Sequence, residues 1–223
     1  ADDEPLGWAY VNDRAEIVGR MLSWEPEPGP DEAFWRKRLR EAIDLRLALP
    51  DLLPRRADTA CRLVNAESDG LPGLVIDRYG PFLVLQALTA GIDRRKTDLA
   101  RWSAELWTEA SGQPVTGVYE RSDVDVRAKE GLSEATGSLL GDEPPDLLWM
   151  REGEGCYWSY ESYWSYESYR TNRTDETDRT HETRPPQERA IELPVDIRRG
   201  HKTGAYLDQA DNRRRVARYA AGR

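Results

Sequence analysis

The stretch LVIDRYGPFLVLQAL, residues 74–88, decides the fold of this chain. Two apolar runs, 74–77 and 81–88, lie on either side of a turn at Tyr79-Gly80, which is the pattern of two adjacent strands. A further apolar run at 61–65 precedes them, and turn signals at Asp69-Gly70 and Pro72-Gly73 separate it from the rest. The three runs predict neighbouring strands of an antiparallel meander.

Helical patterns surround this meander. Asp31 is a candidate N-cap for a helix that ends near Leu49, because Pro50 cannot continue it. A second helix is predicted over 93–110 and a strand over 115–119. The run 147–150 reads as the first half of a hairpin whose second strand has been displaced along the chain. This order of strands and helices predicts an α+β domain.

An unusual insertion causes that displacement. The hexapeptide YWSYES at 157–162 is repeated at 163–168 and followed by polar sequence up to Pro185-Pro186. One interpretation is an aromatic ladder that stacks nucleic-acid bases. The other is a disordered insertion, which the lack of apolar residues after the repeat favours.

The amino-acid composition argues against several classes of protein. The 223 residues include 41 acidic and 32 basic side chains, a formal net charge of −9, which argues against a generally basic protein that coats nucleic acid. Residues 198–223 reverse the balance, with eight basic and two acidic side chains, and could hold an anionic partner. No apolar run is long enough to cross a membrane, and the acidic first residues do not resemble a secretory signal. A cytoplasmic protein without a membrane segment is expected.

The residue types that usually carry catalysis are sparse. Cys61 and Cys156 are far apart and read as ordinary thiols, while His181 and His201 lack the spacing of a metal site. We therefore predict no metal and assign no catalytic residue.

The most informative segment is GHKTGAYLD, residues 200–208. Two glycines flank a Lys-Thr pair and allow a ligand to approach the backbone, Tyr206 offers an aromatic face, and Asp208 starts a helix. The alternative is a basic loop before a solvated, arginine-rich helix.

Three ordered segments carry a resemblance to a known family: HKTGAYLDQ at 201–209, ESDGLPGLVIDRYG at 67–80 and ERSDVDVRAKEG at 120–131. The chain resembles the bacterial SAM-dependent large-subunit (23S) ribosomal RNA cytosine-5 methyltransferases over about residues 6–153 and 188–223. Such enzymes have a PUA domain, a central α+β domain and a Rossmann-like catalytic domain.

The resemblance implies a fold class and a domain division. The fold class is α+β: a partial PUA-like β remnant at 1–25, then a central mixed α+β domain at 26–153. The Tyr/Thr/Arg-rich insertion follows at 154–187, and a final strand, a Lys-Thr-Gly loop and a basic helix at 188–223. A Rossmann-like methyltransferase domain is expected to be absent, the chain being truncated at both ends and inactive alone.

The same resemblance implies site residues. S-adenosyl-L-methionine (SAM) is the expected cofactor, with backbone approach at Thr203 and Gly204, packing from Tyr206, and polar contacts from Lys202 and Asp208. In such enzymes a cysteine thiolate adds to carbon 6 of the base and activates carbon 5. Neither cysteine of this chain has a comparable context, and negligible SAM binding is expected for this chain alone.

Ribosomal RNA is the expected partner. Its phosphates would be met by basic side chains in two segments, Arg121, Arg127 and Lys129 in one and Arg213, Arg214 and Arg215 in the other. The alternative for the first segment is a salt-bridged surface, because Glu120, Asp123, Asp125 and Glu130 lie among its cations. For the whole chain, the alternative to part of a methyltransferase is a stand-alone, non-catalytic RNA-binding or ribosome-assembly module.

Overall fold

The computed structural model describes residues 4–48, 58–152 and 191–207. The repeated hexapeptide and the rest of the predicted insertion lie outside these ranges, as do Asp208, Arg213, Arg214 and Arg215. In the described part, no helix is long and apolar enough to cross a lipid bilayer.

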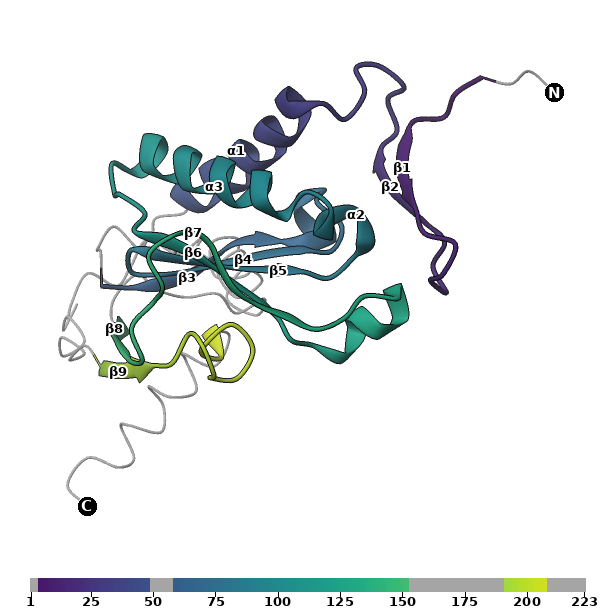
Figure 1. The fold of residues 1–223 in the computed structure, drawn as a ribbon. Helices are drawn as coiled ribbons and strands as arrows, with labels where there is room; N and C mark the ends of the chain where they lie inside the picture. Colours follow the sequence, from purple (N-terminus) through teal and green to yellow (C-terminus); the bar gives the residue numbers. More distant parts are fainter. Residues whose placement is uncertain (1–3, 49–57, 153–190, 208–223) are drawn as a thin grey trace, which may run out of the picture.

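A five-stranded sheet forms the centre of the molecule (Figure 1). Its strands, in spatial order, are β3 (Ala60–Asn65), β4 (Leu74–Tyr79), β5 (Phe82–Ala87), β6 (Gly117–Ser122) and β7 (Ala135–Gly141). Strands β3, β4 and β5 pair antiparallel in sequence order, which confirms the predicted meander. A short 3₁₀ turn, η1 (Ala66–Asp69), connects β3 to β4.

The sheet is mixed, because β5 and β6 run parallel. The chain crosses from one to the other through α2 (Ala90–Asp93) and α3 (Lys96–Ser111). A strand, a helical crossover and a parallel strand form the βαβ unit from which Rossmann-like domains are built. The sequence predicted β5, α3 and a strand at β6, but neither α2 nor the parallel pairing that the crossover produces.

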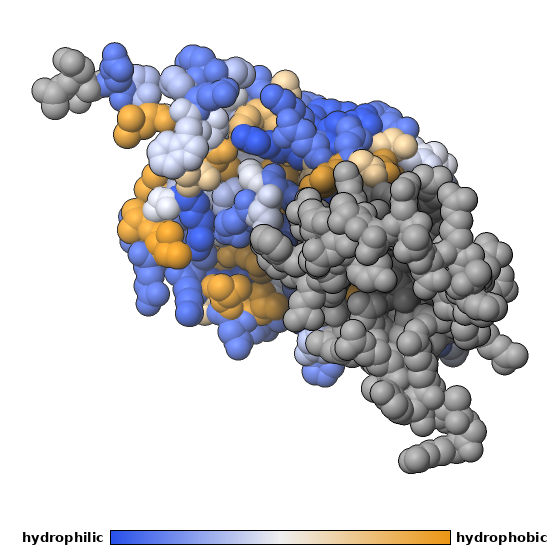
Figure 2. Space-filling view, turned by 180° about the vertical axis from the view of Figure 1, so that it is seen from behind, coloured by the Kyte–Doolittle hydropathy of each residue, from blue (hydrophilic) through white to orange (hydrophobic). Residues whose placement is uncertain are grey.

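Two helices cover one face of the sheet (Figure 1). Helix α1 (Glu32–Ala48) and helix α3 bury Trp35, Leu39, Ile43 and Trp107 against alternate residues of the strands. Every residue of β4, β5 and β6 is buried, as expected for strands covered on both faces. Space-filling Figure 2 shows the molecule from behind, with hydrophilic residues along its upper edge.

The N-cap of α1 is formed as predicted. The backbone N–H of Phe34 donates a hydrogen bond of 2.9 Å to Oδ1 of Asp31, which satisfies a donor that has no partner within the helix. We expect Asp31→Ala to lower the free energy of unfolding by about 1 kcal/mol. Chemical denaturation measures this loss, and Asp31→Asn, which keeps the accepting oxygen, should recover most of it.

The other face of the sheet carries a second hairpin. Strands β8 (Leu148–Glu152) and β9 (Ile191–Val195) pair antiparallel, which confirms the predicted hairpin with its distant second strand. Met150 and Val195 from this hairpin pack with Tyr79, Phe82 and Val84 of the sheet. The segment that follows β9 is thereby brought against the sheet.

A third, separate hairpin lies at one end of the molecule (Figure 1). Strands β1 (Trp8–Val11) and β2 (Gly19–Ser23) pair antiparallel, and this hairpin exposes Leu6, Val11, Ile17, Val18 and Trp24. The proposed PUA-like origin of this hairpin, like the domain division as a whole, stays a prediction.

Glu130 fastens this hairpin to the central domain. Glu130 is the last residue of the 3₁₀ turn η2 (Asp125–Glu130) and is 5% exposed. Its carboxylate accepts hydrogen bonds from Arg20 Nη2 (2.8 Å) and Asn12 Nδ2 (3.0 Å). Burial alone would raise the pKa of Glu130, but the hydrogen bonds from Arg20, Asn12 and the Ala90 amide outweigh it and hold the pKa below its usual value.

A pH dependence follows from this lowered pKa. A carboxyl group that is more acidic in the folded protein stabilises it fully above its unfolded-state pKa, about 4.3 for glutamate. The stabilisation is lost as the pH falls through the lower, folded-state value. We expect the melting temperature to fall with pH in this range, and Glu130→Gln to flatten the dependence. An unchanged slope in that variant would contradict the assignment.

Candidate functional site

The loop that follows β9, residues 196–207, contains the predicted Lys-Thr-Gly segment. Oδ1 of Asp196 accepts hydrogen bonds of 2.9 Å from the backbone N–H groups of Arg198 and Arg199, and its carbonyl accepts one from Gly200 N (2.9 Å). A Cβ atom at Gly200 would lie 2.3 Å from the Asp196 carbonyl oxygen, so only glycine fits there. Gly204 has φ of +144°, a conformation that side chains disfavour.

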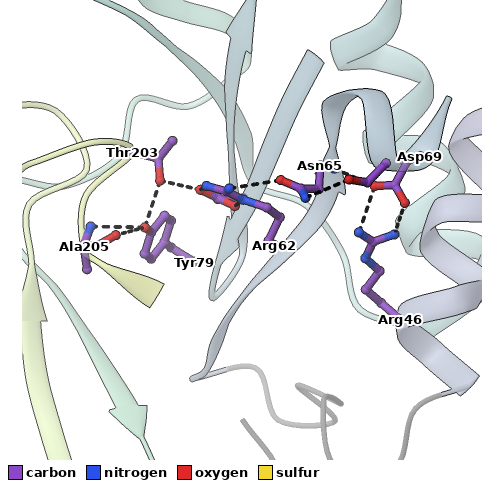
Figure 3. Close-up of polar contacts among 9 residues, drawn as sticks. Arg46, Arg62, Asn65, Asp69, Tyr79, Thr203 and Ala205 are labelled. Carbon is purple, nitrogen blue, oxygen red and sulfur yellow. Dashed lines mark hydrogen bonds and ion pairs between the residues drawn. The ribbon is translucent and has the colours of Figure 1, made fainter. Parts of the chain in front are cut away.

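Thr203 anchors this loop inside the protein (Figure 3). Its side chain is fully buried, and Oγ1 donates a hydrogen bond of 2.6 Å to Oδ2 of Asp77. Because a carboxylate only accepts, the Thr203 hydroxyl must in turn accept from the Tyr79 hydroxyl at 3.0 Å. The Tyr79 hydroxyl accepts from the Ala205 backbone N–H at 3.1 Å. A directed chain of hydrogen bonds thus joins loop and sheet.

The surroundings keep this chain intact. Burial, and then the negative charge of Asp77, raise the pKa of Tyr79, so its phenol stays protonated and able to donate. Arg62 donates to both oxygens of Asp77, at 2.8 and 3.1 Å. From Arg62 the polar contacts continue to Asn65, and from there to the buried ion pair between Asp69 and Arg46 (Figure 3).

Arg121 forms a second anchor. It lies on β6, is 4% exposed, and donates to the carbonyl oxygens of Ile197 (2.5 Å) and Gly200 (2.8 Å). Its Nε and Nη2 atoms donate to the carboxylate of Asp123 at 2.9 and 3.1 Å. Burial would raise the pKa of Asp123, but the hydrogen bond from Arg121 contributes to holding it below its usual value.

Three exposed side chains of the loop lie together: His201, Lys202 and Tyr206. Lys202 Nζ lies 4.5 Å from the centroid of the Tyr206 ring, in a cation–π contact, and the His201 ring lies 6.0 Å from it. This group, which we call the outward face of the loop, combines a cation, an imidazole and an aromatic ring.

The predicted cofactor-binding residues therefore separate into two sets. Lys202 and Tyr206 lie on the outward face. The Thr203 side chain is instead hydrogen-bonded in the interior, and Gly204 is half-buried. Asp208 lies outside the described residues. Sequence reasoning missed Asp77 and Tyr79, although polar side chains that directly follow the apolar run Leu74–Ile76 were a usable signal of an interior polar contact.

The predicted RNA-contacting residues also separate. Arg127 is 3% exposed and donates to the carbonyl oxygens of Ala87 and Ser133 and to Asp93, so like Arg121 it is engaged in the interior. Lys129 is exposed on the same 3₁₀ turn. Arg213, Arg214 and Arg215 lie outside the described residues. RNA contact by any of these residues stays a prediction, and the burial of Arg121 and Arg127 favours interior roles for those two.

Two solved structures with a similar fold belong to proteins that are named as methyltransferases. A protein from Streptococcus mutans, assigned to the SAM-dependent methyltransferases, matches with a TM-score of 0.57 and 20% identity, over 95% of this chain and 42% of its own. A second, assigned as a methyltransferase and complexed with SAH, matches with a TM-score of 0.59 and 19% identity, over 95% of this chain and 41% of its own.

These matches correct the predicted fold class. The sequence reading expected an α+β chain from which a Rossmann-like methyltransferase domain is absent. The described residues instead form a central mixed sheet with a βαβ crossover, and the likeness to methyltransferase structures extends over 95% of the chain. The expectation of absence is therefore wrong.

Curated relatives agree with the solved structures, while no protein-family model matches the chain. The chain is 38% identical over 220 residues to the ribosomal RNA large subunit methyltransferase I of Erwinia tasmaniensis, and 36% identical over 209 residues to that of Aeromonas hydrophila. The chain spans less than half of these relatives, 44% and 42% of their lengths. Over 98% and 94% of its own length, respectively, this chain is similar to ribosomal RNA large subunit methyltransferase I proteins.

Proposed function

We propose that this chain is part of a SAM-dependent methyltransferase that methylates carbon 5 of a cytosine in large-subunit ribosomal RNA. The observation that carries the proposal is the 38% identity to a ribosomal RNA large subunit methyltransferase I over 98% of the chain. The cytosine-5 specificity rests on the resemblance of the segments at 67–80, 120–131 and 201–209. Such an enzyme would meet its RNA in the cytoplasm.

The outward face of the loop has the chemistry that SAM requires. SAM, when bound, supplies a methyl group on a positively charged sulfonium. The Tyr206 ring already attracts the ammonium group of Lys202, so it can equally lie against a sulfonium or an adenine ring. Lys202 offers a cation to the carboxylate of the same molecule, and Gly204 leaves the backbone accessible. Asp208 would add a polar contact.

RNA would be held by exposed cations. Lys129 is exposed on η2, and Arg213, Arg214 and Arg215 complete the proposed set. The described residues suggest no catalytic base or nucleophile of their own. The part of the relatives that this chain does not match would complete the catalytic site.

A chimera tests the proposal. Residues 1–223 replace the matching segment of the Erwinia tasmaniensis relative, and transfer of labelled methyl from SAM to unmodified large-subunit ribosomal RNA is measured. We expect transfer, with the KM for SAM raised in Lys202→Ala and Tyr206→Ala. A folded chimera that binds the RNA without transferring methyl would contradict the proposal and favour a non-catalytic RNA-binding module.

A further inference from the structure

The loop is fixed to the interior at points that alternate with its outward side chains. The carbonyls of Ile197 and Gly200 are held by Arg121, and Thr203 and Ala205 are held by Asp77 and Tyr79. The three residues of the outward face, His201, Lys202 and Tyr206, thus each lie next to a fixed residue. Positive φ at Lys202, +56°, shows that the backbone between these anchors takes one specific path.

Arg121 is suited to hold this path. Its planar guanidinium binds two carbonyls three residues apart, and Asp123 fixes the orientation of the same group through two further hydrogen bonds. A lysine at this position has a single nitrogen and cannot reproduce this planar set of contacts. Because the side chain is buried, these contacts are not exchanged for contacts with water.

We propose that Arg121 is a positioning residue for methyl-donor binding, and not a contact to RNA phosphate. It acts through the carbonyls of Ile197 and Gly200, which set where Lys202 and Tyr206 are presented. This inference rests on the proposed function for its ligand, SAM. Its structural half, that Arg121 fixes the path of the loop, does not depend on that function; its functional half is the effect on SAM binding.

The structural half is tested in the 223-residue chain without ligand. Hydrogen exchange is followed at the amides of Gly200 and Gly204, which donate to Asp196 and His201 within the loop. We expect Arg121→Met to speed this exchange about tenfold relative to amides of β4 and β5, and Arg121→Lys to have an intermediate effect. Arg127→Met is the matched control, because Arg127 is equally buried and likewise donates to two carbonyls and a carboxylate, none of which lies in the loop.

The functional half is tested in the chimera described above. Arg121→Met should raise the KM for SAM about tenfold while changing kcat less than about threefold, and Arg127→Met should leave the KM for SAM unchanged. Equal effects of the two variants on loop exchange and on KM would overturn the proposal. An inactive chimera would refute the proposed function, while loop exchange would still decide the role of Arg121.

A second pair of variants guards against a failure of Arg121→Met to fold. Thr203→Val removes the hydroxyl that donates to Asp77 while keeping the shape of the side chain, and Thr203→Ser keeps the hydroxyl. We expect faster loop exchange and a raised KM in the first variant and near wild-type behaviour in the second. The same behaviour in both would show that the anchors do not position the loop.

Discussion

Arg127→Met is expected to lower the free energy of unfolding by about 3 kcal/mol. The guanidinium of Arg127 is buried and connects the end of β5, the segment before β7 and Asp93 at the end of α2. Removing it leaves two carbonyl oxygens and a half-buried carboxylate without these partners, and each such loss costs about 1 to 3 kcal/mol. Chemical denaturation of the 223-residue chain measures the effect.

Lys129→Ala is the matched contrast, because Lys129 lies two residues away on the same turn but is exposed. We expect a change in stability within about 0.5 kcal/mol. If Lys129 contacts a phosphate, the salt dependence of RNA binding should become shallower by about one unit in slope. Equal stability losses in the two variants would contradict the interior role of Arg127.

Gly91→Ala is expected to loosen the β1–β2 hairpin from the central domain, at a cost of about 1 to 3 kcal/mol. A Cβ atom at Gly91 would lie 2.4 Å from Cγ of the Tyr10 ring, far closer than such atoms approach. Tyr10 in turn donates a hydrogen bond of 2.7 Å to the carbonyl of Pro72, so displacing its ring also breaks this contact.

A double-mutant cycle with Tyr10→Ala separates this contact from a general effect on α2. Once the ring is absent, Gly91→Ala should cost little, giving a coupling energy of about 1 kcal/mol or more. Gly19→Ala is the control on the same hairpin, because its Cβ would meet no atom within 4 Å. A full additive cost in the double variant would show that Tyr10 and Gly91 do not hold the hairpin.

Local pattern was enough to predict most of the elements. The apolar runs at 61–65, 74–77 and 81–88 are β3, β4 and β5, and Asp31 caps α1. These features depend on side-chain periodicity and on hydrogen bonds between near neighbours, which a sequence displays directly. The parallel pairing of β5 with β6 depends on how a helical crossover packs, and the predicted absence of a Rossmann-like domain was wrong.

The site was predictable only in part, for a related reason. The segment 200–206 stands out in the sequence as glycine-flanked and basic, but which side chains point inward depends on contacts between distant positions. Thr203 meets Asp77 across 126 positions, and Arg121 meets Gly200 across 79. An arginine in a charge-rich segment has the same local pattern whether it is exposed or buried, so Arg121 and Arg127 could not be told apart from Lys129.

The identity of the methylated nucleoside tests the central claim most directly. The chimera is incubated with labelled SAM and unmodified large-subunit ribosomal RNA, the RNA is digested to nucleosides, and the labelled product is identified by mass and chromatography. The account predicts 5-methylcytidine, with less label at limiting SAM in Lys202→Ala, Tyr206→Ala and Arg121→Met. Label on another base, or an equal yield from all these variants, would contradict it.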